Sequence, residues 1–267
     1  MRPPQFLMCR PTHYTIAYEI NPWMRLSRQA AQPLAARQWA RLHHLLTDRL
    51  KARVTLLPAV RGLPDLVFTA NAGLVVGRTL IRSNFRYPQR QGEEAVVERY
   101  FAQRGFRIVR LPRAFNFEGE GDALWMGETL VMGFRFRSDA NAHERLARRL
   151  QREVLPVELV DRRFYHLDTC FCPLAAASAL WYPGAFDRYG RKVIERLVEH
   201  PLAVSRRDAL RFCCNAVVIG RDVVVQRGIS RALAHALAAR GVTVHEVDLS
   251  EFLKAGGSAK CLVLRLA

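Results

Sequence analysis

One supersecondary unit recurs along this chain of 267 residues. Two short apolar segments joined by a tight turn are followed by a helical pattern and then by a further strand, and ALWMGETLVM and AVVIGRDVVV are two such hairpins. The unit returns about every fifty residues, although the residues themselves do not repeat visibly. This spacing predicts an α/β fold built as a ring or propeller of modules, and it argues against one doubly wound sheet.

The period of the apolar residues assigns the individual elements. The expected helices are Ser27–Lys51, Glu93–Arg104, Asn141–Arg152, Asp187–Glu199 and Ile229–Arg240. The expected strands are Arg53–Leu57, Leu66–Thr69, Gly73–Val76, Arg107–Leu111, Ala123–Met126, Thr129–Met132, Val157–Val160, Leu167–Cys172, Ala216–Ile219, Asp222–Val225, Val242–Val247 and Cys261–Leu264. Helix N-caps are expected at Ser27, at Asp187 and at either Ser138 or Asp139. No Ser/Gly/Pro-rich linker interrupts the pattern, so we expect a single domain over residues 1–267.

The composition excludes several classes of protein. Because 50% of the residues are hydrophobic, the chain can offset its ordering entropy and is not expected to be disordered. No run of 18 apolar residues free of charge exists, which argues against a membrane span and a membrane partner. The first twenty residues lack the basic-then-apolar order of a secretory signal, so we expect a cytoplasmic protein.

The net charge of +17 invites a nucleic-acid interpretation, but its distribution does not support one. Only four of the 41 cationic residues are lysines, and the arginines are scattered among acidic residues along the chain. Scattered arginine is more typical of a solvated surface than of a groove that follows phosphates. We therefore expect no nucleic-acid partner.

Six cysteines are too few for a disulfide framework in a chain of this length. The spacing of His166, Cys170 and Cys172 leaves a metal site open, but the pairs lack the two-residue gap of a structural zinc site. Buried free thiols are the simpler interpretation for most of the cysteines. At least one remains available for chemistry, and the sequence calls for neither a metal nor a cofactor.

Two polar segments occur where apolar strands begin or end. The first is PDLVFTANAG, in which a strand core is followed by Asn71 and Gly73; taken alone, this segment is better explained by a plain turn at the end of a strand. The second is NFEGEGD, where Glu118, Glu120 and Asp122 alternate with glycines that allow a ligand to approach the backbone. These carboxylates suit a metal, a guanidinium or an ammonium, although a solvated turn remains an equal alternative.

Two further segments carry groups that transfer protons or attack carbon. In YHLDT, an extended backbone would place His166 and Asp168 on the same face, as a proton shuttle beside an anion. In GGSAKC, a Gly-Gly turn presents Cys261 next to Lys260, which could lower the pKa of the thiol. Each segment alone also fits a structural role, but the four together point to a site.

In their order and spacing, these segments resemble the amidinotransferase superfamily of guanidine-modifying enzymes. Its members include arginine deiminase, dimethylarginine dimethylaminohydrolase and arginine dihydrolase. The similarity runs from the CRP segment that begins at Cys9 to the GGSAKC segment that ends at Cys261, nearly the whole chain. The resemblance implies the pentein fold, a five-bladed β/α propeller of ββαβ modules around a pseudo-fivefold axis, in agreement with the recurring unit.

The resemblance also implies roles for single residues. Cys261 matches the family's nucleophile, His166 its general acid and base, and Glu118 the acidic residue that holds the guanidinium. Asp168 resembles a second such anchor, and Asp122 a loop aspartate that orders the site. The remaining matches are contacts with the substrate. Arg90 and Arg137 resemble the family's clamps on the substrate α-carboxylate, and Arg135 competes with Arg137 for that role. Asn21 resembles a further substrate contact.

Asn71 separates the alternatives within the family. Arginine deiminases carry an aspartate at this position, whereas arginine dihydrolases resemble this sequence in carrying asparagine. An amide can donate to the ureido oxygen of citrulline and so retain it for a second hydrolysis. The expected activity is therefore hydrolysis of arginine to ornithine, ammonia and carbon dioxide. Methylarginine hydrolysis, arginine deimination and a non-catalytic basic binding protein stay open, and the oligomeric state is undetermined, a homo-oligomer included.

Overall fold

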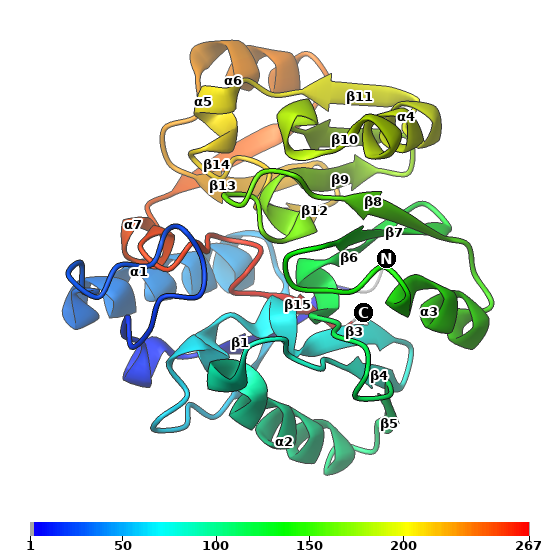
Figure 1. The fold of residues 1–267 in the computed structure, drawn as a ribbon. Coiled ribbons are helices and arrows are strands. Elements are labelled where there is room, and N and C mark those ends of the chain that lie inside the picture. Colours follow the sequence, from blue (N-terminus) through cyan, green and yellow to red (C-terminus); the bar gives the residue numbers. More distant parts are fainter. Residues whose placement is uncertain (1–2, 267) are drawn as a thin grey trace.

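The computed structural model describes residues 3–266, and within them five sheets of three strands each are formed. In every sheet the central strand pairs antiparallel with one neighbour and parallel with the other. Figure 1 shows the sheets distributed around a central region, with the longer helices on the periphery. The predicted ring of α/β modules is confirmed.

Each sheet is one module, in which the strand order runs from the antiparallel neighbour through the central strand to the parallel neighbour. The first contains β15 (Leu264–Arg265), β1 (Gln5–Cys9) and β2 (Arg53–Leu57). The second contains β3 (Gly73–Val76), β4 (Thr79–Arg82) and β5 (Arg107–Arg110). The third contains β6 (Ala123–Met126), β7 (Thr129–Phe134) and β8 (Val154–Glu158). The fourth contains β9 (Phe171–Ala175), β10 (Ser178–Trp181) and β11 (His200–Ala203), and the fifth β12 (Val217–Ile219), β13 (Asp222–Gln226) and β14 (Thr243–Val247).

A helix connects the two parallel strands in every module, because a parallel pair cannot be joined by a tight turn. In chain order these helices are α1 (Gln32–His44), α2 (Pro88–Ala102), α3 (Ala142–Leu150), α4 (Arg188–Leu197) and α6 (Arg231–Ala238). Two short helices, α5 (Arg206–Ala209) and α7 (Ser250–Leu253), lie in the connections between modules. A π-helical turn, Leu45–Arg49, extends α1.

The hydrophobic core lies between the helices and the sheets. Trp39 and Leu42 of α1 pack in one cluster with Phe6 and Met8 of β1, and Phe101 of α2 packs with the second sheet. Apolar side chains from the innermost strands of four of the sheets line one common cavity. Each module therefore buries its helix-facing side on its own and its inner side against its neighbours.

Two predicted strands are wrong, and both lie at the site. Leu66–Thr69 belongs to two short 3-10 turns, Pro64–Val67 and Thr69–Ala72, because Pro64 lacks the N–H that a strand would use and starts a turn instead. Leu167–Thr169 is a third such turn, and the strand begins only at Phe171. The prediction that one extended backbone places His166 and Asp168 on the same face therefore fails, because Asp168 lies in the turn and His166 is the N-cap residue before it.

Helix boundaries and caps also differ from expectation. Asp187 caps α4 as predicted, since its carboxylate accepts the N–H groups of Tyr189 and Gly190. The first helix begins at Gln32 and not at Ser27, because the carboxylate of Glu251 accepts the N–H of Ala31 and caps the helix from outside.

In the third helix, too, a residue other than the predicted ones is the N-cap. Its N-cap is Asn141, whereas Ser138 and Asp139 bond instead to the loop 116–122.

The ends of the remaining elements are also shifted. The last strand starts at Leu264, so Cys261 lies in the turn before it. Strands β1, β4, β10 and β11 were not predicted, and α2 starts at Pro88 and so includes Arg90. Within residues 3–266, no helix is both long enough and apolar enough to cross a membrane.

Candidate active site

Three 3-10 turns from consecutive modules meet at the site. They are Thr69–Ala72, Gly119–Gly121 and Leu167–Thr169, and each lies directly before the first strand of its module. Polar residues favour such turns because they can bond to backbone groups that no strand satisfies. The repeat of the module therefore gathers the polar ends of several hairpins at one place.

Cys261 is buried at this place beside a carboxylate. Its Sγ lies 3.4 Å from Oδ2 of Asp168, and the amide of Asn215 donates to the same sulfur at 3.1 Å. The carbonyl of Cys261 accepts the N–H of Ala70. This bond links the segment 258–261, called the cysteine turn below, to the turn that carries Asn71. Burial, and next to it the charge of Asp168, raise the pKa of the Cys261 thiol well above its ordinary value. The thiol is therefore neutral at pH 7 in the ligand-free protein.

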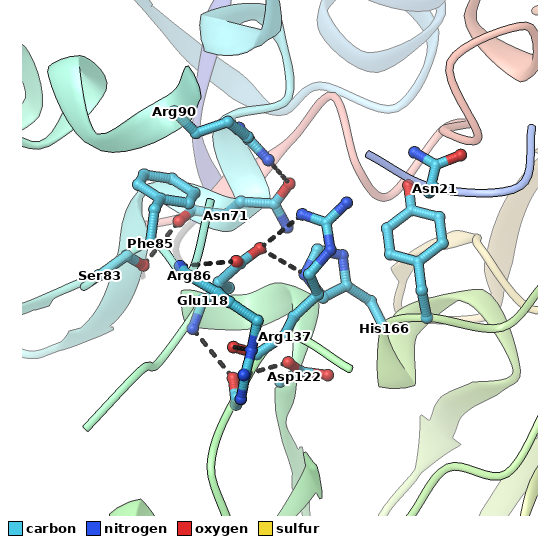
Figure 2. A network of polar contacts seen from close by, with 12 residues as sticks. Asn21, Asn71, Ser83, Phe85, Arg86, Arg90, Glu118, Asp122, Arg137 and His166 are labelled. Carbon is cyan, nitrogen blue, oxygen red and sulfur yellow. Dashed lines mark hydrogen bonds and ion pairs between the residues drawn. The ribbon is translucent and has the colours of Figure 1, made fainter. Parts of the chain in front are cut away.

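His166 is oriented by Glu118. Its Nε2 lies 2.8 Å from Oε2 of Glu118, and the guanidinium of Arg137 bonds to the same oxygen at 3.1 Å (Figure 2). Although burial acts to raise it, Arg137 and His166 bring the pKa of Glu118 well below its usual range. A charged Glu118 accepts a hydrogen bond from the N–H at Nε2, which leaves the other ring nitrogen, Nδ1, as the proton-accepting atom. That Nδ1 is buried and has no hydrogen-bond partner among residues 3–266.

Asn71 is held by a buried cation. Nη1 of Arg90 donates to Oδ1 of Asn71 at 2.8 Å (Figure 2), and Glu93 fixes the guanidinium through two bonds of 2.8 Å each. Because a guanidinium only donates, the oxygen of the Asn71 amide must face Arg90 and the nitrogen must face the other way. Nδ2 of Asn71 is left without a partner in the described part of the chain.

The unpartnered atoms of Asn71 and His166 flank the same glycine. A Cβ placed on Gly121 would lie 2.3 Å from Nδ2 of Asn71 and 3.2 Å from Nδ1 of His166, so no larger residue fits there. Oδ1 of Asp168, which lies beside the cysteine turn, and the hydroxyl of Ser258, within this turn, are likewise buried without a partner within residues 3–266. Buried polar groups in proteins are almost always hydrogen-bonded. A cluster of exceptions therefore marks a place where a polar ligand binds.

Two of the carboxylates that the sequence predicted for the site, Asp168 and Asp122, have raised pKa values. Burial raises the pKa of Asp168 to about 7, against the opposing charge of Lys260. Burial raises the pKa of Asp122 to about 6. A cation placed beside Asp168 would favour its charged form.

Asp122 and Asn21 hold the loops around the site. The two oxygens of Asp122 accept the hydroxyl of Ser138 at 2.6 Å and the N–H of Leu167 at 3.1 Å, so they link two of the modules. The amide of Asn21 donates to the carbonyl of Ala255 at 3.0 Å, in the segment that precedes the cysteine. A direct contact of either residue with substrate stays a prediction.

Arg137 and Arg135, which compete for one predicted role, lie in different surroundings. Arg137 has 2% of its side chain exposed and lies between the rings of Tyr87 and Tyr165, 4.7 Å from each. Arg135 is 50% exposed and pairs with Glu158 on the surface. Of the two, only Arg137 lies at the site. Arg90 and Arg137 are both engaged by protein carboxylates, and their role as carboxylate clamps stays a prediction.

Sequence reasoning missed two buried residues at the site. Asn215 contacts the sulfur of Cys261 directly, and Asp65 has one carboxylate oxygen without a partner among the described residues. A signal for Asn215 was present, because Asn-Ala precedes the hairpin in two modules, at Asn71-Ala72 and Asn215-Ala216. Over residues 3–266, no group of three His, Cys, Asp or Glu side chains is arranged to hold a metal ion, the histidine and cysteines near residue 170 included.

Comparisons with known proteins agree with this geometry. The family model described as N,N dimethylarginine dimethylhydrolase, eukaryotic, matches residues 2–267. The bifunctional arginine dihydrolase/ornithine cyclodeaminase ArgZ of Synechocystis sp. is 45% identical over 98% of this chain. The N(G),N(G)-dimethylarginine dimethylaminohydrolase of Mycobacterium tuberculosis is 37% identical, over 98% of this chain and 85% of its own length.

A crystal structure extends the comparison to three dimensions. The N-terminal domain of ArgZ, in a variant that replaces an asparagine with serine and is covalently bound to a reaction intermediate, superimposes with a TM-score of 0.94. The two chains are 44% identical, and the match covers 99% of this chain and 98% of that domain. The chain spans only 37% of the length of the complete bifunctional ArgZ.

Proposed function

The chain belongs to the N,N dimethylarginine dimethylhydrolase family, and we propose that it hydrolyses the guanidino group of arginine to ornithine, ammonia and carbon dioxide. The observation that carries this proposal is a set of buried polar atoms without a partner among residues 3–266, namely Asn71 Nδ2 and His166 Nδ1 around Gly121, and Asp168 Oδ1 beside Cys261. A guanidinium supplies donors for the carboxylate, and the ureido group of citrulline supplies an acceptor for the amide.

The chemistry starts from a neutral thiol. A guanidinium bound against Asp168 neutralises the charge that raises the pKa of Cys261, so substrate binding favours the thiolate. Nδ1 of His166 takes the proton of the thiol, the thiolate attacks the guanidino carbon, and the same Nδ1 then gives this proton to the departing nitrogen. Ammonia leaves and a thiouronium remains on the sulfur. His166 then removes a proton from water, which attacks the same carbon and releases citrulline with the free thiol.

A second round completes the proposed reaction. Citrulline that stays in the site meets the amide nitrogen of Asn71, which can donate to its ureido oxygen. Attack and hydrolysis at the same carbon then release a second ammonia, ornithine and carbon dioxide, so that two waters are consumed for each arginine. Arg90 supports this role because it fixes the orientation of the Asn71 amide.

The other proposed parts of the site assist this reaction. Glu118 holds His166 in position and, through Arg137, one wall of the site. We propose Arg90, Arg137 and Asn21 as contacts for the amino-acid end of the substrate, and Asp122 as the residue that orders the loop. A single domain over residues 1–267 suffices for this activity, and the cytoplasm is the proposed compartment because six free cysteines suit a reducing environment.

A product assay tests the proposal and its nearest alternative. The purified protein is incubated with arginine, dimethylarginine, agmatine and citrulline, and ornithine, citrulline, dimethylamine and ammonia are quantified by mass spectrometry. We expect ornithine from arginine with two ammonia per turnover. In Asn71→Asp, Arg90 still bonds one oxygen, but a second acceptor replaces Nδ2, so we expect citrulline to accumulate.

Each other outcome has a defined meaning. A wild-type protein that stops at citrulline contradicts the second hydrolysis, and faster release of dimethylamine than of ornithine favours methylarginine hydrolysis. Cys261→Ser is the control, and we expect it to lose turnover by at least about 10³-fold because a hydroxyl is a poor nucleophile at its ordinary pKa.

A further inference from the structure

Asn215 makes every hydrogen bond that an asparagine side chain can make. Its oxygen accepts the N–H groups of Ser258 and Cys261, each at 3.1 Å. Its nitrogen donates to the carbonyl of Asp168 at 3.2 Å and to the sulfur of Cys261 at 3.1 Å. Two acceptor sites and two donor hydrogens are thus all used, in a side chain with no exposed surface.

This arrangement fixes which way the amide points. Two backbone N–H groups on the cysteine turn can be satisfied only by the oxygen, so the nitrogen must face the sulfur. The backbone of Asn215 is bonded to the same turn, because its carbonyl accepts the N–H of Lys260 at 3.2 Å. The cysteine turn is therefore held along its length by one residue from the fifth module.

The chain before Asn215 adopts an unusual backbone to reach this place. Phe212 is a buried, bulky residue with a φ of 61°, a left-handed conformation that is strained for any residue with such a side chain. Its carbonyl accepts the N–H of Asn215, and its ring packs edge-on against Trp23. Residues held in such a conformation cluster at functional sites, where the surrounding structure enforces them.

We propose that Asn215 is a positioning residue that fixes the Cys261 sulfur and, by donating a hydrogen bond to it, favours its thiolate form in the reaction proposed above. Removing this donor makes the charged sulfur harder to form, whichever guanidino compound is the substrate. The inference rests on the proposed function only in that it assigns Cys261 as the nucleophile.

Other groups near the sulfur could also favour or disfavour the thiolate form of Cys261. Asp168 faces the sulfur at 3.4 Å and disfavours the thiolate, whereas Tyr165 brings no charge, because burial raises the pKa of its hydroxyl well above the ordinary value. Lys260 is adjacent in sequence, but its ammonium bonds to Glu120 at 2.7 Å, away from the sulfur. The amide of Asn215 is thus the one side-chain donor on the sulfur within the described residues.

The test uses Asn215→Asp, which keeps the size of the side chain. One oxygen still accepts the two N–H groups, but the other now faces the sulfur and the Asp168 carbonyl as an acceptor. We expect the pH midpoint of Cys261 alkylation by iodoacetamide to rise by about one unit or more. For arginine turnover we expect kcat to fall about 100-fold while KM changes less than about threefold, because the group acts on the nucleophile and not on binding.

The matched control is Asn84→Asp. Asn84 is also a buried asparagine whose amide bonds to loop carbonyls, those of Leu111, Pro112 and Phe115, but it does not touch Cys261. We expect this variant to lose stability without any shift in the alkylation midpoint. If both variants shift the midpoint equally, Asn215 acts only through general loosening and the proposal is wrong.

A second variant and a second readout separate the possible failures. Should Asn215→Asp not fold, Asn215→Ala removes the donor without adding an acceptor, and its alkylation midpoint is expected to rise as well. An unchanged midpoint in a folded Asn215 variant overturns the inference. If the wild type processes no guanidino compound but the midpoint still shifts, the proposed function fails while the positioning role of Asn215 stands.

Discussion

Asn71 and Asn215 occupy the same position in two modules but are used in opposite ways. Each lies two residues before the first strand of its hairpin, β3 or β12. The oxygen of Asn71 is held by a cation, Arg90, and its nitrogen has no partner among residues 3–266. All the bonds of Asn215 are made within the protein, one of them to the nucleophile. The difference shows that the amide at one repeated position can either keep an atom without a protein partner in the described residues or make all its bonds within the protein, depending on what fixes it.

The largest expected effect tests the surroundings of the Cys261 sulfur, which Asn215 and Asp168 both contact. Asp168→Asn removes the carboxylate beside the sulfur, so we expect kcat/KM for arginine to fall by at least about 10³-fold. The same change removes a charge that raises the pKa of Cys261, so alkylation by iodoacetamide at pH 7 should become about threefold to tenfold faster. Turnover and alkylation therefore move in opposite directions, whereas in Asn215→Asp both decrease. If alkylation slows in Asp168→Asn, the two neighbours of the sulfur do not act oppositely.

The next prediction tests the buried ion pair of Arg90 and Glu93, which holds the Asn71 amide. Glu93→Gln removes the nearer counter-charge of the buried Arg90 guanidinium and leaves only Asp65, at 3.9 Å, among the described residues, so we expect the free energy of unfolding to fall by about 3 kcal/mol, measured with urea. The alkylation midpoint of Cys261 should stay at its wild-type value, because Arg90 holds Asn71 and not the sulfur. Glu144→Gln, which breaks an exposed pair with Arg148, should change stability by less than about 0.5 kcal/mol. A shifted alkylation midpoint in Glu93→Gln would show that the surroundings of Asn71 and those of the Cys261 sulfur do not act independently.

The smallest expected effect is a pH dependence. Burial raises the pKa of Asp168 to about 7, well above the ordinary value of an aspartate, so the folded protein keeps a proton that the unfolded chain loses first. Its contribution to stability is complete below about pH 4 and declines as the pH rises to about 7.

This pH dependence is read as a difference between two proteins. Between pH 5 and pH 8 we expect wild type to lose on the order of 1–3 kcal/mol more stability than Asp168→Asn in urea unfolding. Glu93 and Asp122, whose pKa values are also raised, act alike in both proteins and cancel in the difference. Equal slopes in the two proteins would mean that Asp168 is already charged when the site is free.

Most of the fold could be predicted from the sequence because hairpin, helix and strand are local patterns. The hairpins ALWMGETLVM and AVVIGRDVVV became β6–β7 and β12–β13, and the repeat gave the ring. The segments around Leu66 and Leu167 were misjudged because a buried 3-10 turn and a buried strand are equally apolar, and periodicity cannot separate them over four residues. The caps at Ser138 and Asp139 failed because tertiary contacts at the site took up these side chains.

The site itself was predictable as a set of residues but not as a geometry. Cys261, Asp168, His166 and Glu118 do come together, whereas their hydrogen-bond partners depend on modules that are distant in the sequence. Asn215 is 46 residues from Cys261 and lies in a segment that is otherwise apolar, CCNAVVI, so no local pattern marked it. Only the repeated Asn-Ala pair before two hairpins could have revealed it.

The pairing of β1 with β15 has a consequence for the order of events during synthesis. β15 completes the first sheet by pairing with β1, with Leu264 opposite Leu7, and Cys261 lies three residues before β15. A nascent chain translated through β14 already contains every strand of the other four sheets, yet it has neither the nucleophile nor the strand that completes the first. The reactive thiol thus emerges from the ribosome after all the other residues of the site, and we expect its protection against alkylation to appear only when the ring closes.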